Sequence, residues 1–244
     1  MTTRIAVVTG GGSGIGRATC TRLTADGFTL AVLDVDGEAA KVAAGPDGLG
    51  CAADVAERDA VDAAFAQVVA AFGRIDVLVN NAGVSGTVDA TICHETTVEE
   101  WDRVLAINTR GPFLCARAAL PVMLAQGSGH IITVASVAGQ VAFPGRCAYT
   151  ASKGAALMFA KSLAADYAAA GIRSNAVCPG FVRTPMTQWR LDVPELREQV
   201  EARIPTGRVA EPDDIADAIA VLASGRMGYM TGAALVVDGG WTVL

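Results

Sequence analysis

The stretch "VVTGGGSGIGRA", residues 7–18, joins an apolar run to a helix-like pattern through five glycines. Glycines in such a turn let backbone N–H groups approach a phosphate, and the N-terminus of the following helix favours negative charge. Glycines alone indicate only a tight turn, but their place between a strand and a helix predicts a dinucleotide-binding loop. The loop residues expected to contact the pyrophosphate are Gly10, Ser13, Gly14, Ile15 and Gly16.

Short runs rich in Val and Ile recur after this loop, and helical patterns separate many of them. Apolar runs without alternation are typical of strands covered on both faces, and their alternation with helices indicates right-handed crossovers. We therefore expect a single-domain α/β Rossmann fold over residues 1–244, with a doubly wound, seven-stranded parallel sheet flanked by helices. The predicted strands are residues 4–10, 29–34, 49–55, 75–83, 129–136, 172–180 and 234–240. The predicted helices are residues 15–27, 57–72, 97–125, 148–170 and 213–224.

Residues 180–210 are expected to form the one long irregular segment of the chain, and they carry Pro185, Pro194 and Pro205. Irregular segments of this length in compact domains usually act as lids or as binding loops. We therefore predict that residues 180–210 form a lid that contacts the substrate.

The composition indicates a packed, autonomous core, since 52% of the residues are hydrophobic and 18% are charged. A net charge of -6 and the absence of a basic run argue against a nucleic-acid partner. Six dispersed cysteines and two histidines spell out neither a metal site nor a disulfide framework, so the cysteines are expected to be small core residues. The N-terminus lacks the pattern of a signal peptide and no apolar run approaches membrane-spanning length, which predicts a cytoplasmic protein without a membrane partner.

A carboxylate, Asp34, closes the second predicted strand. At this position of a dinucleotide-binding fold, a carboxylate accepts hydrogen bonds from the ribose hydroxyls and repels a 2′-phosphate. Its neighbours Leu33, Val35 and Asp36 include no arginine, which favours NAD over NADP as the cofactor. Two alternatives stay open: Arg17 could reach an extra phosphate, and Asp34 could do no more than cap a loop.

Tyr149 and Lys153 are four residues apart on one predicted helix, so their side chains lie on the same face. A nearby ammonium group favours the phenolate, and we therefore expect the pKa of Tyr149 to lie below its ordinary value. Such a pair is common on solvated helices, but Ser136 ends the preceding strand at the edge where ligands of open α/β sheets bind. The three side chains together predict general acid/base chemistry on a substrate oxygen.

The chain resembles the short-chain dehydrogenase/reductase family from end to end. The motifs that carry the resemblance are "TGGGSGIG" (9–16), "NNAG" (80–83), "YTASK" (149–153) and "PGFVRT" (179–184). Asn108 in "AINTRG" and Ser136 also fall in the family's order and spacing. The resemblance implies an enzyme that transfers a hydride between a nicotinamide cofactor and a secondary alcohol or ketone.

The same resemblance implies roles for individual residues. The implied catalytic tetrad is Asn108, Ser136, Tyr149 and Lys153, where Lys153 also binds the nicotinamide ribose and Asn108 holds a helix bend and a relay water. Asp54 and Val55 are implied at the adenine. The remaining implied cofactor residues are Asn81, Ala82 and Gly83 on the adenosine side and Pro179, Val182 and Thr184 near the carboxamide.

Two arginines lie in the segments that select the substrate in this family: Arg146 precedes Tyr149, and Arg190 belongs to the predicted lid. A guanidinium binds a carboxylate, phosphate or sulfonate through paired hydrogen bonds, so the pair predicts a small anionic substrate. Likeness to family members that oxidise a sulfonate-bearing secondary alcohol implies that Met186 and Trp189 line the same pocket. The alternative is that both arginines are solvated surface residues.

The predicted helix 151–170 is apolar on more than one stripe, so one stripe can pack on the sheet while the other needs a partner. We expect a homo-oligomer, and the family resemblance implies a homotetramer. Three functions compete: an NAD-dependent dehydrogenase of a small anionic alcohol such as a 2-hydroxyalkyl sulfonate thioether, a 3-oxoacyl thioester reductase, and a dinucleotide-binding protein without turnover. The intact serine, tyrosine and lysine argue against the third.

Overall fold

Seven parallel strands form one sheet in the computed structural model, which describes residues 3–87 and 91–243. The strand order is β3-β2-β1-β4-β5-β6-β7. The strands are β1 Arg4–Thr9, β2 Phe28–Asp34, β3 Leu49–Ala52, β4 Val77–Asn80, β5 Gly129–Val134, β6 Ile172–Pro179 and β7 Ala234–Val237. The predicted doubly wound Rossmann sheet is therefore confirmed. The order reverses between β1 and β4, which opens a crevice at the carboxyl ends of these two strands.

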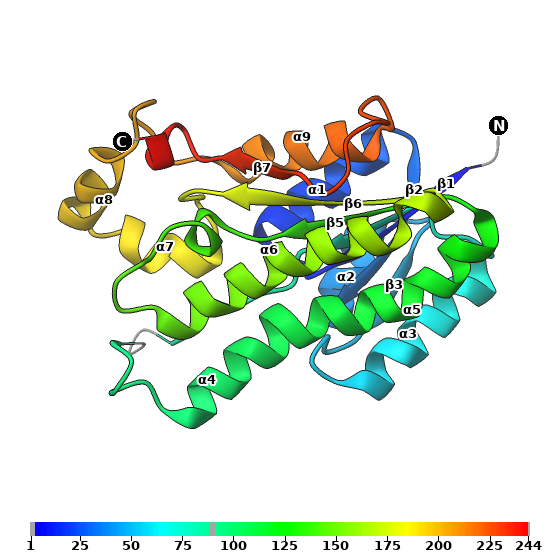
Figure 1. Ribbon diagram of the computed structural model, residues 1–244, viewed down its shortest axis with the longest axis horizontal. Coiled ribbons are helices and arrows are strands. Elements are labelled where there is room, and N and C mark those ends of the chain that lie inside the picture. The colour runs from blue at the N-terminus through cyan, green and yellow to red at the C-terminus, as the bar shows by residue number, and fades with distance from the viewer. Residues whose placement is uncertain (1–2, 88–90, 244) are drawn as a thin grey trace.

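Helices cover both faces of the sheet: α1 and α9 lie on one side, while α3, α4, α5 and α6 lie on the other (Figure 1). The helices are α1 Gly14–Ala25, α2 Gly37–Ala44, α3 Arg58–Phe72, α4 Val98–Leu105, α5 Gly111–Gln126, α6 Cys147–Tyr167, α7 Pro185–Leu191, α8 Pro194–Glu201 and α9 Pro212–Ala223. Figure 1 places α7 and α8 beyond the carboxyl ends of the strands, which puts them beside the crevice. This single layered arrangement supports the one domain that we propose for residues 1–244.

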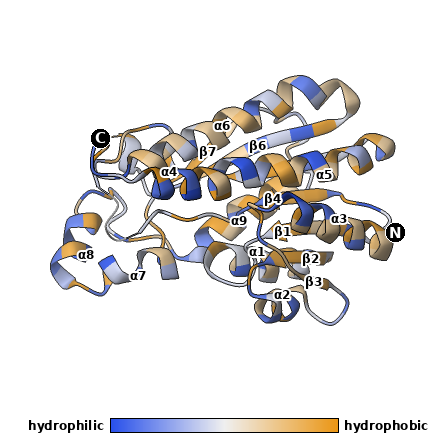
Figure 2. Ribbon diagram, turned by 90° about the horizontal axis from the view of Figure 1, so that it is seen from below, coloured by the Kyte–Doolittle hydropathy of each residue, from blue (hydrophilic) through white to orange (hydrophobic). Residues whose placement is uncertain are grey.

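Two apolar clusters hold the helices against the sheet, one on each face. Leu78 and Ile131 belong to the cluster beneath α3 and α5, and Val8 and Val79 belong to the cluster beneath α1 and α9. Figure 2 shows β1, β2 and β4 in the colours of hydrophobic residues. Side chains of these strands alternate between the two faces, which is why their sequences are apolar without a polar stripe.

The helical predictions needed two corrections on the first half of the chain. Helix α2 was missed because its eight residues carry little pattern, although Asp36 accepts hydrogen bonds from the Glu38 and Ala39 N–H groups and caps its start. The predicted helix 97–125 is interrupted by a π-helical turn at Ala106–Arg110, which contains Asn108. Such turns often occur at functional sites.

The prediction that residues 180–210 are irregular was wrong, because α7 and α8 lie within this segment. Pro185 and Pro194 begin these helices instead of breaking them, since a helix leaves its first N–H groups without intrahelical partners. Thr184 caps α7 in a reciprocal arrangement with Thr187. These two prolines therefore mark the starts of helices and not an irregular loop.

Four cysteines are buried as expected, but Cys93 is exposed and Cys147 is only half-buried. The prediction of six core cysteines was therefore wrong for these two positions. All six thiols are free. Among the helices of the described residues, none combines the length and the apolar character that a membrane span requires.

A buried histidine joins three elements near the start of β5. The His130 Nδ1 lies 3.1 Å from the Leu222 carbonyl oxygen, and Nε2 lies 2.9 Å from the Asn175 side-chain amide nitrogen. An amide nitrogen donates to Nε2, so Nδ1 carries the proton and the ring is neutral. Burial and, to a smaller extent, the nearby Arg173 charge lower the pKa of His130 to about 3, while the hydrogen bond to the Leu222 carbonyl opposes the shift.

We expect His130 to make the fold sensitive to acid. His130 takes up a proton near pH 6.5 in the unfolded chain but only near pH 3 in the folded chain. The stability that the neutral ring contributes is therefore fully present above pH 6.5 and is lost progressively as the pH falls from 6.5 toward 3. The expected slope is about 1.4 kcal/mol per pH unit. Urea unfolding of His130→Gln between pH 7.5 and 5 should show a flatter pH dependence than the unchanged protein. His94→Gln, at an exposed histidine, is the control; an unchanged slope in His130→Gln would contradict this account.

Candidate active site

A cleft of about 600 Å³ opens at the carboxyl ends of the central strands. It brings together most of the residues that the sequence predicted, although these come from seven separate segments of the chain. The predicted residues that line it are Gly10, Ser13, Gly14, Ile15, Asp34, Asp54, Val55, Asn81, Ala82, Gly83, Ser136, Arg146, Tyr149, Lys153, Pro179, Val182, Thr184, Met186 and Trp189. Gly16, Asn108 and Arg190 are not among the lining residues.

The glycine loop packs closely against its surroundings. Gly10 has φ +63°, and a Cβ there would lie 2.8 Å from the Ala82 Cα. A Cβ on Gly16 would collide with the Gly10 carbonyl oxygen, so Gly16 closes the loop from beneath instead of lining the cleft. The Asn81 side-chain amide donates to the Thr9 and Gly10 carbonyls at 3.0 Å each and ties β4 to the loop.

The start of α1 fits a phosphate group. Ser13 occupies the N-cap, yet within the described residues its side chain makes no capping hydrogen bond. The first N–H groups of a helix have no intrahelical partner and carry the positive end of the helix dipole. The residues present at the mouth of the cleft therefore fit the diphosphate of a dinucleotide.

Asp34 has a structural function besides lining the cleft. Its Oδ2 accepts a hydrogen bond from the Gly12 N–H at 2.8 Å, and Oδ1 accepts one from the Asp36 N–H at 3.0 Å. The carboxylate therefore fixes the end of β2 against the glycine loop, and its charge faces the cleft. Arg17, the residue that could have reached an extra phosphate, is exposed and is not among the lining residues.

Ser136, Tyr149 and Lys153 line one part of the cleft. Lys153 is buried; its Nζ donates to the Val134 carbonyl oxygen at 2.9 Å and lies 5.9 Å from the centre of the Tyr149 ring. Burial lowers the pKa of Lys153 to about 8, because an ammonium group loses its hydration there.

The pKa of Tyr149 lies above its ordinary value, so the prediction that it lies below was wrong. Burial is the larger effect and raises it, while the hydrogen bond with the Ser136 hydroxyl opposes the rise. The error came from weighing the neighbouring charge without weighing the loss of solvent around the phenol, which disfavours phenolate.

Asn108 lies beneath the cleft in the π-helical turn. Its Oδ1 accepts a hydrogen bond from the Val84 N–H, and its Nδ2 donates to the Val84 carbonyl at 2.8 Å and to the Ser152 hydroxyl at 2.9 Å. One side chain therefore holds the segment after β4 against α6, the helix that carries Tyr149 and Lys153. This is consistent with the implied position of Asn108 at a helix irregularity.

The two arginines differ in their surroundings. Arg146 lines the cleft, and its Nη1 donates to the Thr87 carbonyl at 2.8 Å. Arg190 lies 5.7 Å above the centre of the Phe181 ring, and its buried Nε has no hydrogen-bond partner among the described residues. Burial lowers the pKa of Arg146, and the charge of Arg190 lowers it further, whereas Glu100 opposes this shift. The two guanidinium groups are therefore close enough to repel each other.

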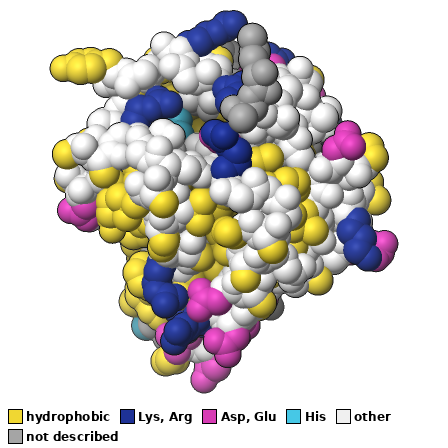
Figure 3. Space-filling model, turned by 90° about the vertical axis from the view of Figure 1, so that its right-hand side faces the viewer, with side chains coloured by type: hydrophobic (Ala, Val, Ile, Leu, Met, Phe, Trp, Pro, Cys, Tyr) yellow, Lys and Arg dark blue, Asp and Glu magenta, His cyan; other side chains and the backbone are white. Residues whose placement is uncertain are grey.

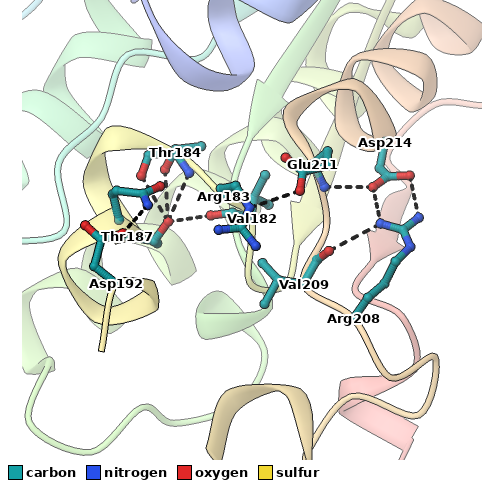
Figure 4. A network of polar contacts seen from close by, with 10 residues as sticks. Val182, Arg183, Thr184, Thr187, Asp192, Arg208, Val209, Glu211 and Asp214 are labelled. Atoms are coloured by element: carbon teal, nitrogen blue, oxygen red, sulfur yellow. Dashed lines mark hydrogen bonds and ion pairs between the residues drawn. The ribbon is translucent and has the colours of Figure 1, made fainter. Parts of the chain in front are cut away.

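A polar network fixes the segment between β6 and α7 (Figure 4). The Thr187 hydroxyl donates to the Val182 carbonyl, and the Thr184 N–H donates to Thr187 at 3.1 Å. Arg183 pairs with Glu211 at 3.0 Å, which ties this segment to the start of α9. The base of the predicted lid is thus attached to α9, which itself packs on the sheet. The other labelled members of the network are Asp192, Arg208, Val209 and Asp214.

Sequence reasoning missed one part of the cleft wall, which follows β4. Ser85, Gly86 and Thr87 line the cleft together with Arg103 from α4. The "NNAG" motif immediately before these residues was the available signal, because the chain that leaves a strand at the ligand-binding edge also borders the site. Glu100 supports this wall, since its carboxylate accepts the Thr87 N–H at 2.6 Å and pairs with Arg103.

Comparisons with known proteins agree with this geometry. The family model described as Enoyl-(Acyl carrier protein) reductase, adh_short_C2, matches residues 10–242. The 2-(R)-hydroxypropyl-CoM dehydrogenase of Xanthobacter autotrophicus is 52% identical over 99% of each chain. The chain is a short-chain dehydrogenase/reductase. This oxidoreductase is also 39% identical to the 3-oxoacyl-(acyl-carrier-protein) reductase FabG of Staphylococcus aureus, over 98% of each chain. The crystal structure of gox2181 superposes with a TM-score of 0.95 at 34% identity, covering 100% of this chain and 97% of the other.

The buried lysine of this dehydrogenase should lower its stability. The folded-state pKa of about 8 lies below the ordinary 10.5, so the fold loses stability as the pH falls from 10.5 to 8, and the full penalty is present below pH 8. Lys153→Met should therefore raise the free energy of unfolding at pH 7 by up to about 3 kcal/mol, with little gain near pH 10.5. Urea unfolding at both pH values measures this. Lys161→Met, on the exposed face of α6, is the control; a loss of stability at pH 7 in Lys153→Met would contradict the expectation.

Proposed function

We propose that this enzyme is an NAD-dependent dehydrogenase that interconverts a small secondary alcohol and its ketone, with an anionic group of the substrate bound by Arg146 and Arg190. A 2-hydroxyalkyl sulfonate thioether is the favoured substrate class. The relative with 52% identity, named 2-(R)-hydroxypropyl-CoM dehydrogenase, supports this choice. The proposal depends chiefly on two cations, Arg146 in the same cleft as Tyr149 and Arg190 close to Arg146, that no carboxylate among the described residues neutralises by a direct ion pair.

The surroundings of the arginines favour an anion over a neutral group. Repulsion between the two guanidinium groups destabilises the site unless a negative group lies near both. A sulfonate or carboxylate would accept hydrogen bonds from both, including the buried Arg190 Nε–H that lacks a partner among the described residues. Arg146 lines the same cleft as Tyr149, so the anion would lie a short distance from the reacting carbon.

The choice of NAD rests on Asp34. The carboxylate is fixed by the Gly12 and Asp36 N–H groups at the end of β2 and cannot easily swing away from a 2′-phosphate. Asp36 adds a second negative charge next to it. A 2′-phosphate would be repelled here, whereas ribose hydroxyls could donate to the carboxylate.

The side chains of the cleft divide the proton chemistry between them. Bound NAD would supply the hydride acceptor and a positive charge near the phenol. In alcohol oxidation, Tyr149 takes the hydroxyl proton of the substrate, and Ser136 donates a hydrogen bond to the same oxygen. Lys153 stabilises the phenolate, since its cation lies on the same side of α6. Asn108 holds α6 and the segment after β4 in fixed relative positions through its hydrogen bonds to both.

We also propose that the enzyme assembles as a homotetramer through the outer faces of α5 and α6. Phe113 and Leu124 on α5 are 48% and 45% exposed, and Met158 on α6 is 60% exposed. Hydrophobic side chains also gather on the side of the molecule that faces right in Figure 1, as Figure 3 shows. Contiguous apolar surface of this kind usually marks a contact with another chain.

A 3-oxoacyl thioester reductase is the second candidate, because the FabG relative is 39% identical over 98% of each chain. The two functions differ in cofactor and substrate. Turnover followed at the nicotinamide absorbance, with NADPH and acetoacetyl-CoA or with NAD and 2-(R)-hydroxypropyl-CoM, separates them. Faster reaction with the first pair would favour the reductase, and no reaction with either would favour a dinucleotide-binding protein without turnover.

Tyr149→Phe should lower kcat by at least about a thousandfold, because the phenyl ring keeps the packing of Tyr149 and removes the group that accepts the proton. NAD affinity, measured by calorimetric titration, should change little. Tyr167→Phe on the same helix lies outside the cleft and should behave as the unchanged enzyme. A Tyr149→Phe enzyme with near-normal turnover would remove Tyr149 from the mechanism.

Replacing Arg146 and Arg190 together by alanine should raise KM for 2-(R)-hydroxypropyl-CoM by at least about thirtyfold, since each truncation of a charged hydrogen-bonded group costs about 2 kcal/mol or more. The value of kcat/KM for neutral 2-butanol should change by less than about threefold. Arg197→Ala, at an exposed arginine of α8, is the matched control. Equal losses for the anionic and the neutral alcohol would rule out the arginines as an anion anchor.

A further inference from the structure

Three aromatic rings join the segments that carry the two arginines. Phe143 lies in the loop before α6, three residues ahead of Arg146, and Phe181 follows β6. Trp241 contacts both: its ring centre is 5.4 Å from that of Phe143 and 4.8 Å from that of Phe181, and the two phenylalanine ring centres are 6.3 Å apart. The Trp241 and Phe181 rings are stacked with an angle of 8° between their planes.

The turn that carries Trp241 is held rigidly. The Asp238 carboxylate accepts hydrogen bonds from the Gly240 N–H at 2.8 Å and from the Thr242 N–H at 2.9 Å. Gly239 and Gly240 have φ +65° and +91°, and a Cβ on Gly239 would lie 2.5 Å from the Thr206 hydroxyl oxygen. Trp241 is only 7% exposed. The ring therefore has one position, set by the backbone after β7.

Arg190 meets the other face of this assembly. Its guanidinium lies over the Phe181 ring, while the guanidinium of Arg203 lies 4.9 Å from the centre of the Trp241 ring. Two cations and two rings thus form one stack, and each cation–ring contact is favourable because the face of a ring is electron-rich. The stack leaves the Nε–H of Arg190 buried without a partner among the described residues.

We propose that Trp241 is a positioning residue that sets the separation of Arg146 and Arg190, and thereby the preference of the enzyme for an anionic substrate. This inference rests on the proposed anion-binding function of the two arginines. Trp241 contacts Phe143 next to Arg146 and Phe181 beneath Arg190, so one rigid ring fixes both loops. Pre-organised cations bind an anion more tightly than cations that must first be ordered.

The test compares Trp241→Leu with Trp241→Phe, using 2-(R)-hydroxypropyl-CoM and neutral 2-butanol as substrates and NAD as cofactor. Trp241→Leu should raise KM for the anionic alcohol by about tenfold, in the range expected for a lost ring contact. The value of kcat, the kcat/KM for 2-butanol and the NAD dissociation constant should stay within about twofold. Trp241→Phe, which keeps a stacked ring, should restore most of the affinity. Trp101→Leu on α4 is the matched control.

A double-mutant cycle separates this inference from the proposed function. In an Arg190→Ala background, Trp241→Leu should raise KM for the anionic alcohol clearly less than it does in the unchanged enzyme, because the part of its effect that acts through Arg190 is already lost. Additive effects, or equal losses for both alcohols, would overturn the positioning role while leaving the anion anchor intact. If Arg190→Ala itself shows no selectivity for the anion, the proposed function fails first. Should Trp241→Leu not fold, Phe181→Leu interrupts the same stack and must give the same selective rise in KM.

Discussion

The backbone of the first turn approaches its neighbours more closely than a side chain would allow. A Cβ on Gly16 would overlap the Gly10 carbonyl, and a Cβ on Gly10 would press on Ala82. This contact lets α1 start directly at the end of β1, beside the end of β4, where the order of the sheet reverses. It also turns the unpaired N–H groups of α1 toward the cleft. The remaining functional segments are arranged around this opening.

Most of the fold and of the cofactor cleft could be predicted because their signals are local. The apolar runs fixed the strands, and the predicted sheet of seven strands is confirmed. Gly10 and Asp34 lie in the cleft because each directly follows or ends a strand, and strand ends meet at one edge. A motif at the end of a strand can therefore be placed at the ligand-binding edge of the sheet from the sequence alone.

The predictions that failed depend on contacts between distant residues. Pro185 and Pro194 occupy the first turns of helices, where a proline is as much a local start signal as a loop signal, so the local pattern could not decide between the two. The raised pKa of Tyr149 reflects burial beneath several segments of the chain. Thr87 and Arg103 line the cleft wall because both contact the Glu100 carboxylate, and Thr87 is thirteen residues away from Glu100 in the sequence. Tertiary surroundings, which the sequence does not display, decide each of these cases.

Negative and positive side chains lie in different parts of the cleft. Asp34 places negative charge in one part of the cleft, while Lys153 and Arg146 place positive charge beside Tyr149, and Arg190 lies near Arg146 outside the lining. Glu100 moderates the charge of Arg146, but it is already engaged by Arg103 and the Thr87 N–H. An anionic substrate would relieve the repulsion between the arginines and would also stabilise the charged form of Lys153. The same cation favours the phenolate of Tyr149, whereas the substrate anion would disfavour it, so the proposed function requires the anion to lie closer to the arginines than to the phenol.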